Sequence, residues 1–264
     1  MQVLLEFLEY LENFSGLVPN TLRLYKRDLL DFELFIKKKH GELFDVTSLS
    51  KDDLEDFSTH ISNQGSSTAT VNRKLTALRK FWNWLKENGK VEKDPFSQIF
   101  RESQYRNKSF ECLSEEEINL LLDCENLELR TKLILELLYS CCLRVNELLG
   151  LTVEDISLNE KIITVVNTRN KKIRLVPITD LLFSLLEAYL EEVELNSVDK
   201  LFNISAREVY RIVSKAAQEL GINKKITAST LRNSFIKHMK ERGAHKVFIQ
   251  DITGQKNLNE AVFN

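Results

Sequence analysis

Residues 137–151 read LLYSCCLRVNELLGL, an apolar stretch that contains one arginine, Arg144, and one glutamate, Glu147. The pattern predicts a long helix within residues 130–151 that places Glu147 on the face of Arg144, one turn later. A guanidinium on an apolar helix has to be paired or has to receive an anion, because an isolated buried charge is costly. Arg144 therefore either pairs with Glu147 and reaches the surface, or forms part of an anion site.

A second arginine, Arg232, lies in another helical pattern, TLRNSFIKHM at residues 230–239. Two arginines from distant segments are what a site for a phosphodiester group requires, since guanidinium groups bind phosphate oxygens through paired hydrogen bonds. This second arginine favours the anion site over the simple ion pair.

The composition indicates a soluble globular protein of one to two domains, with 264 residues, 43% hydrophobic and 29% charged. The low counts of Gly (8) and Pro (3) are typical of long helices with few tight turns. No apolar run approaches the roughly 20 residues of a membrane helix, and no signal-peptide layout opens the chain. We therefore expect a cytoplasmic protein with no membrane partner. Phosphate-binding glycine loops are also absent, which disfavours nucleotide-binding enzymes. We expect no small-molecule substrate.

The four cysteines show no C-x-x-C spacing, and Cys141 and Cys142 are adjacent within the apolar stretch. Such thiols are typical of a protein core in a reducing cytoplasm. We expect no metal site and no cofactor.

The charge is unevenly distributed along the chain. A net charge of −2 and a pI of about 6.2 argue mildly against a nucleic-acid partner. Residues 205–246, however, contain ten Lys/Arg against three Glu. This basic segment is either a nucleic-acid surface or an ordinary solvated face.

Residues 1–100 are predicted to form an all-helical domain, with helices that begin after Val18, Ser50 and Ser67. The last of these helices carries a stripe of four basic side chains opposite its apolar face. The stripe either follows a DNA backbone or keeps the helix soluble; it consists of Arg73, Lys74, Arg79 and Lys80.

The polar stretch 101–111 is predicted to be a linker to a second domain, residues 112–264. In that domain, the β-branched runs 161–166 and 173–178 flank a cationic turn and predict a hairpin with a basic tip. Helical patterns fill the remainder. The predicted fold is mainly α, with an all-helical first domain and a mostly helical α/β second domain that holds a small sheet.

These motifs, taken in order, resemble the tyrosine recombinase (phage integrase, Xer-like) family over essentially the whole chain. Residues 137–151 look like its first arginine box, and residues 231–239 look like its second. The run from Gly243 to Gly254 follows the approach to its last motif. Residues 68–85 are similar to part of its SAM-like core-binding domain, which binds DNA.

The resemblance implies a metal-free reaction. In the family, a tyrosine attacks a DNA phosphodiester and remains attached to the 3′-phosphate. Two arginines bind the non-bridging oxygens and offset the charge of the transition state. A lysine on the hairpin protonates the leaving oxygen, and histidines assist proton transfer.

Carried over to this chain, the two arginines match Arg144 and Arg232, with Glu147 as the supporting acid of the first box. The hairpin lysine position falls on Arg169, although Lys171 or Lys172 could reach the leaving oxygen as the proton donor. Arginine, with a pKa above about 12, is a poorer proton donor than lysine.

The remaining positions depart from the family pattern. Its histidine three residues before the second arginine is Ser229 here, and its late His/Trp position is Gln255. The nucleophile position falls on the last residue, Asn264, and the six tyrosines lie elsewhere. The catalytic-type domain is thus expected to be truncated at the nucleophile.

Three hypotheses follow. The first is a catalytically degenerate recombinase homologue, a pseudoenzyme related to DNA recombination and integration, that still binds double-stranded DNA. The second is an active recombinase with a displaced nucleophile, for instance one supplied by a second recombinase subunit. The third is a helical interaction protein without DNA contact, or the product of a decaying gene, which the acidic balance favours.

Overall fold

The computed structural model describes residues 2–14, 16–96, 111–167, 171–255 and 258. The chain divides into two compact units, Met1–Arg106 and Asn107–Asn264. Each unit has its own hydrophobic core. Residues 101–110 of the predicted linker lie outside the described residues, so the domain limits at 100 and 112 stay a prediction.

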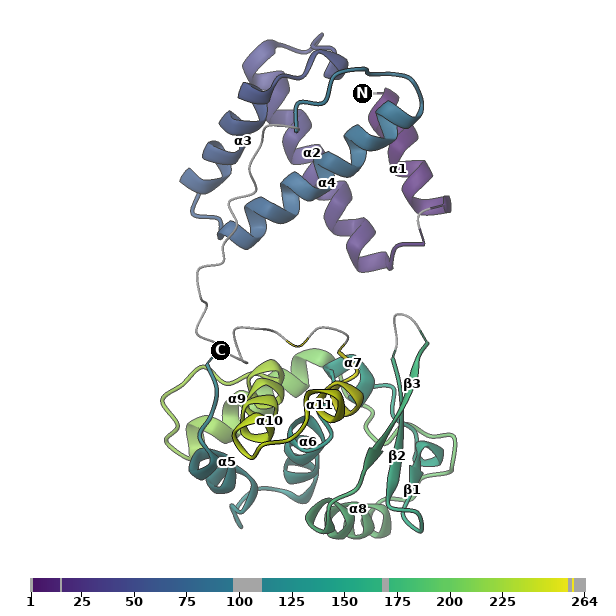
Figure 1. Ribbon diagram of the computed structural model, residues 1–264, viewed down its shortest axis with the longest axis vertical. Helices are drawn as coiled ribbons and strands as arrows, with labels where there is room; N and C mark the ends of the chain where they lie inside the picture. Colours follow the sequence, from purple (N-terminus) through teal and green to yellow (C-terminus); the bar gives the residue numbers. More distant parts are fainter. Residues whose placement is uncertain (1, 15, 97–110, 168–170, 256–257, 259–264) are drawn as a thin grey trace. The chain divides into compact units, whose positions relative to one another are not determined.

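The N-terminal unit is helical, as predicted (Figure 1). Side chains cap two of its helices at the expected residues: Ser50 accepts from the backbone N–H of Asp53, and Ser67 accepts from that of Thr70. Apolar faces of the four helices described in this unit meet in one core around Trp82 and Phe57. The helices are α1 (Gln2–Phe14), α2 (Pro19–His40), α3 (Lys51–Asn63) and α4 (Thr68–Glu87), with a short 3-10 turn at Val46–Ser48.

The C-terminal unit combines helices with a small sheet, so the predicted fold class is confirmed (Figure 1). Capping boxes begin α5 at Ser114 and α9 at Ser205, where the sequence predicts them. The helices are α5 (Glu115–Leu122), α6 (Leu129–Tyr139), α7 (Val145–Leu148), α8 (Asp180–Glu192), α9 (Ala206–Glu219), α10 (Ala228–Glu241) and α11 (Lys246–Thr253). A 3-10 turn, Val153–Asp155, precedes the sheet.

The predicted hairpin is confirmed as β2 (Ile162–Val166) paired antiparallel with β3 (Ile173–Pro177). A two-residue strand, β1 (Ile156–Ser157), extends the sheet on the other side of β2 and was not predicted. On β2, Ile163 and Val165 point into the core, in the alternation expected of a strand with one buried face. β3 contacts α11, which brings the hairpin beside the last described helix (Figure 1).

The prediction of one helix through residues 137–151 is wrong. α6 ends at Tyr139, and Cys142 adopts a left-handed backbone with φ of 51°. The chain then turns back, because the N–H of Leu143 donates to the carbonyl of Leu137 at 3.3 Å. Arg144 becomes the N-cap residue of the short helix α7 rather than a mid-helix side chain. This turn presents the carbonyl of Cys142 to Arg232, which is described below.

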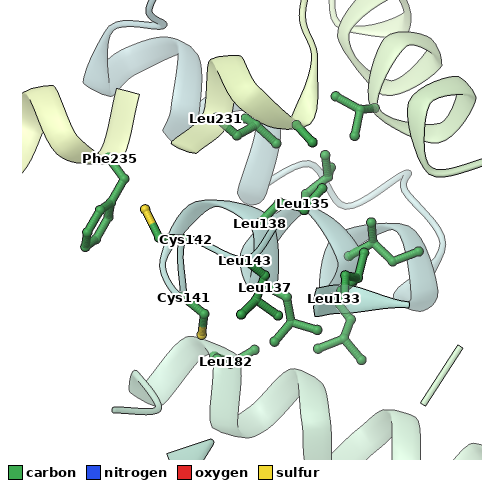
Figure 2. Close-up of a cluster of buried hydrophobic side chains, with 14 of the residues drawn as sticks. Leu133, Leu135, Leu137, Leu138, Cys141, Cys142, Leu143, Leu182, Leu231 and Phe235 are labelled. Atoms are coloured by element: carbon green, nitrogen blue, oxygen red, sulfur yellow. The ribbon is translucent and has the colours of Figure 1, made fainter. Parts of the chain in front are cut away.

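Cys141 and Cys142 are fully buried, as predicted for core thiols. They leave the turn in opposite directions among the leucines of α6 (Figure 2). Burial raises the pKa of each thiol to about 12. They serve as small apolar core residues.

Candidate functional site

Glu147 is the carboxylate at the centre of the candidate site. Its Oε1 accepts from Arg144 Nη1 at 2.7 Å and from Arg174 Nη1 at 3.0 Å. Its Oε2 accepts from the backbone N–H of Arg144 at 2.9 Å and from Arg174 Nη2 at 2.8 Å. The side chain is 1% exposed. One buried carboxylate thus holds two guanidinium groups from two elements, α7 and β3.

The ionised form of Glu147 is favoured despite its burial. Desolvation alone would raise the pKa of this carboxyl group, but the hydrogen bonds from Arg174 and Arg144 outweigh it. The pKa of Glu147 therefore lies below its ordinary value. The Arg144–Glu147 pair predicted as one interpretation of the sequence is present, and Arg144 remains 39% exposed on its side chain.

Arg174 is a site residue that the sequence reasoning missed. It lies on β3 within the run IRLVPI, and its side chain is 10% exposed. Besides its two bonds to Glu147, its Nε donates to the carbonyl of Ile252 at 2.8 Å. A charge in the middle of a β-branched run was the available signal, since a strand with one buried face rarely carries an unpaired arginine. Arg174 joins the sheet, α7 and the end of α11.

Arg232, on α10, is 6% exposed and is held by backbone carbonyls. Its Nη1 donates to the carbonyl of Cys142, and its Nη2 donates to the carbonyl of Thr253. The first acceptor is presented by the left-handed turn after α6. The second lies in the last turn of α11, where unpaired carbonyls and the helix dipole favour a cation.

Burial lowers the pKa of Arg232 to about 10, and the nearby positive charges of Arg144 and Arg174 act in the same direction. The group still carries its charge at neutral pH. The site therefore contains three guanidinium groups against one carboxylate, which leaves it net positive. An oxyanion is the complementary ligand.

Gln255 lies against the Nε–Nη2 edge of Arg232. With its amide oxygen towards the guanidinium, the orientation that matches an acceptor to two donors, it accepts from Nε and from Nη2 at 3.1 Å each. The position that resembles the family's late His/Trp is therefore in direct contact with the second arginine.

Residue 254, beside Arg174 and Gln255, has to be a glycine for two reasons. Its φ of 62° is left-handed, as is common for the residue that ends a helix. A Cβ at this position would lie 3.3 Å from Cδ and 3.4 Å from Nη1 of Arg174. Glycine permits both the end of α11 and the close approach of Arg174.

A hollow of about 350 Å³ adjoins the site between the hairpin and α11. Lys172 and Arg174 line it from the hairpin, and Gln250 and Gln255 line it from the other side. Lys171 is exposed at the hairpin end, with a left-handed φ of 55°. Arg169, the predicted match to the family's lysine, lies outside the described residues, so its role stays a prediction.

Ser229 and Asn264 are the other two positions that depart from the family pattern. Ser229 is exposed on the first turn of α10. Asn264 lies outside the described residues. Neither observation tests the loss of catalysis, which stays a prediction.

The basic stripe of the N-terminal unit makes internal contacts. Arg73 and Lys74 pair with the buried carboxylate of Asp28, and Lys74 also pairs with Asp31. The other two members of the stripe contact aromatic rings: the guanidinium of Arg79 lies 5.5 Å from the ring of Phe96, and the ammonium of Lys80 lies 5.7 Å from the ring of Tyr25. DNA contact by this stripe stays a prediction, with the exposed Lys80 the most accessible member.

α10 is also tied to the start of the C-terminal unit. His238, 1% exposed, bonds through Nε2 to the carbonyl of Leu113 and through Nδ1 to the hydroxyl of Tyr139, both at 2.9 Å. Ser234 accepts from the N–H of Leu113 at 2.8 Å. These bonds use His238 and Tyr139 in the core and fix the helix that carries Arg232.

Among the described residues, His, Cys, Asp and Glu form no group of three or more that is placed to hold a metal ion. In the same part of the chain, none of the helices combines the length and the apolar character that crossing a membrane requires.

Comparison with protein families agrees with this arrangement. Residues 111–263 match the phage integrase family, and residues 4–89 match the phage integrase N-terminal SAM-like domain. A tyrosine recombinase of Pseudothermotoga lettingae is 32% identical over 264 residues, which cover 98% of this chain and 91% of that protein. Tyrosine recombinase XerD of Oceanobacillus iheyensis is also 32% identical, over 96% of this chain and 90% of its own length.

Solved structures share the fold. The XerH site-specific recombinase bound to its difH substrate has a TM-score of 0.72 at 20% identity, over 91% of this chain and 74% of that one. The Tn1549 transposon integrase in complex with a circular intermediate DNA has a TM-score of 0.77 at 17% identity, over 99% and 94% of the two chains. Together with the two family matches and the arginine boxes, these comparisons show that the chain belongs to the phage integrase family of tyrosine recombinases.

Proposed function

We propose that this chain is a DNA-binding tyrosine recombinase homologue that holds a backbone phosphate at its arginine cluster but does not carry out the family's strand cleavage. The observation that carries the proposal is the contrast between the family's arginine positions and its other catalytic positions in this chain. Arg144, Arg232 and Glu147 are kept: Arg144 pairs with Glu147, and Arg232 donates to the carbonyls of Cys142 and Thr253. The proton-transfer and nucleophile positions hold Ser229, Gln255 and Asn264.

The net positive charge of the cluster supports phosphate binding. Arg144 is the exposed arginine of the cluster, and Glu147 and Arg174 hold its surroundings in place. Guanidinium groups so fixed lose little conformational entropy when they bind an anion. We propose that the hairpin cations, Arg169 and Lys171, reach the same DNA backbone.

Two tyrosines of the C-terminal unit have hydroxyls that are bound within the fold, which supports the proposed loss of cleavage. Burial raises the pKa of Tyr139 to about 12, and its hydroxyl is bonded to His238. Burial also raises the pKa of Tyr189, whose hydroxyl donates to the carbonyl of Leu201. A nucleophile needs the opposite, a lowered pKa or an adjacent general base with access to substrate. Both hydroxyls therefore serve the core.

Double-stranded DNA is the proposed partner, and the SAM-like unit is proposed to contact it through Lys80 and the rest of the basic stripe. The solved relatives include a XerH complex with difH and a λ integrase dimer bound to a core site. A second recombinase subunit is the proposed protein partner. We expect all of this to take place in the cytoplasm.

The proposal is tested by measuring duplex DNA binding by fluorescence anisotropy at several salt concentrations. Each phosphate contact contributes about 0.9 to the slope of log K against log salt. We expect Arg144→Ala to weaken binding and to lower this slope by about one contact. Lys161→Ala, which removes an exposed lysine paired with Asp180 and lying outside the basic segment 205–246, is the matched control and should keep the slope.

Binding that is insensitive to salt, or equal in the wild type and in Arg144→Ala, would contradict the proposed phosphate site. Complete absence of binding in a folded sample would favour the interaction-protein hypothesis instead.

A further inference from the structure

Gln255 occupies the edge of Arg232 that a phosphate would use. Nη1 of Arg232 donates to the carbonyl of Cys142, and one N–H of its Nη2 donates to the carbonyl of Thr253. Along the Nε–Nη2 edge, the Nε–H and the second N–H of Nη2 remain, and they form the fork that binds two oxygens of a carboxylate or phosphate. The amide oxygen of Gln255 fills this fork at 3.1 Å from both nitrogens.

The contact occupies the two donors of this edge but does not pair the charge of Arg232 with an anion. An amide oxygen is neutral, and the two carbonyl acceptors are neutral as well. An anionic oxygen would add the Coulomb attraction between opposite charges to these hydrogen bonds, and a phosphate can accept both N–H groups with separate oxygens, so it would replace the amide favourably. Without DNA, the Gln255 amide thus occupies this edge of Arg232, and it is a weaker acceptor than a phosphate.

We infer that the Gln255 side chain is an intramolecular occupant of the phosphate site on Arg232 and competes with DNA for it. This inference rests on the proposed function, since it names what a DNA phosphate must displace. Gln255 is half-buried and borders the hollow of about 350 Å³, so its side chain has space to rotate away from Arg232. Affinity for DNA is therefore lower than the arginine cluster alone would give.

Substitutions at residue 255 can either remove the side chain that competes with DNA or strengthen its contact with Arg232. Gln255→Ala removes it, and we expect duplex DNA to bind on the order of tenfold more tightly, as for one hydrogen bond to a charged group. Gln255→Glu replaces the amide with a carboxylate that pairs with Arg232, and we expect binding weaker by a similar factor. Asn119→Ala, which removes an exposed amide side chain on α5, is the matched control and should bind like the wild type.

The same contact is measured without DNA by thermal unfolding. Gln255→Glu should raise the unfolding temperature of the C-terminal unit at neutral pH, because the new carboxylate pairs with a buried guanidinium. The pair lowers the folded pKa of the carboxylate, so the gain is full above its unfolded pKa of about 4.3 and is lost as the pH falls through the lower folded value.

The two measurements separate the inference from the proposed function. If Arg144→Ala weakens DNA binding but Gln255→Ala binds no more tightly than the wild type, the phosphate site holds and the inference is wrong. If Gln255→Glu does not raise the unfolding temperature, the contact with Arg232 is absent and the inference is wrong even where no variant binds DNA. Tighter binding of Gln255→Ala together with stabilisation by Gln255→Glu supports it.

Discussion

Removing the charge of Glu147 tests how the arginine cluster is held. Glu147→Gln keeps the shape of the side chain, but it leaves Arg144 and Arg174 without a counter-charge and turns an amide N–H₂ towards guanidinium donors. Glu147 is 1% exposed and Arg174 is 10% exposed, so water compensates little. Breaking a buried ion pair by removing one partner costs about 3–5 kcal/mol. Because Arg144 is 39% exposed, we expect the lower end, about 3 kcal/mol.

Urea unfolding of the full chain measures this loss. For m between about 1 and 3 kcal/mol/M, a loss of about 3 kcal/mol lowers the midpoint by about 1–3 M. Both tryptophans, Trp82 and Trp84, lie on α4, so their fluorescence reports the N-terminal unit, while circular dichroism reports both units. We expect the circular dichroism signal of the C-terminal unit to be lost at a lower urea concentration, and the midpoint followed by tryptophan fluorescence to stay unchanged. Asp180→Asn, which breaks an exposed pair with Lys161, is the control and should leave both transitions in place.

The pH dependence of the Glu147→Gln effect has a definite sign. The folded pKa of Glu147 lies below its ordinary value of 4.5. The stabilisation is therefore complete above pH 4.5 and is lost as the pH falls through the lower folded value. A loss under about 1 kcal/mol at neutral pH, which is the range of exposed ion pairs, would refute the reasoning.

Three further predictions concern other parts of the C-terminal unit. Gly254→Ala should lower the free energy of unfolding more than Gly221→Ala. Both residues have a left-handed φ, which costs a residue with a side chain about 1–2 kcal/mol. A Cβ at residue 254 also meets Arg174, whereas the space at residue 221 is open. Equal losses in urea unfolding would exclude the crowding. Glu136→Gln should stabilise the chain increasingly as the pH rises above 4.5, because burial raises the folded pKa of Glu136 and the unfolded carboxyl ionises first. A stability difference that does not change with pH would contradict this. A thiol reagent should modify Cys124 in the native protein and reach the two core thiols only on unfolding, as followed by mass spectrometry.

Local signals in the sequence predicted most helix limits. Ser50, Ser67, Ser114 and Ser205 cap helices where expected, because a cap depends on a few neighbouring residues. The break after Tyr139 was not predictable in the same way. Its left-handed residue is Cys142, and neither glycine nor proline marks the turn. Tertiary contacts hold it, including the bond from Arg232 to the Cys142 carbonyl.

The candidate site was predicted in part. The boxes around Arg144 and Arg232 were visible because arginine is unusual in an apolar helical pattern. Arg174 was not singled out, since its partners, Glu147 and the carbonyl of Ile252, are 27 and 78 residues away in sequence. The contact between Gln255 and Arg232 was missed for the same reason: spacing along the chain does not report which distant segments meet.

Covalent trapping on nicked DNA tests the central claim most directly, that the arginine cluster binds a phosphate without strand cleavage. The protein is incubated with a nicked duplex of the kind that traps a recombinase, and the products are separated on a denaturing gel. We predict no protein–DNA band from a folded sample that binds the same duplex, beside a competent family member that gives one. A band that survives denaturation would contradict the account, and mapping the attached tyrosine would then identify the displaced nucleophile.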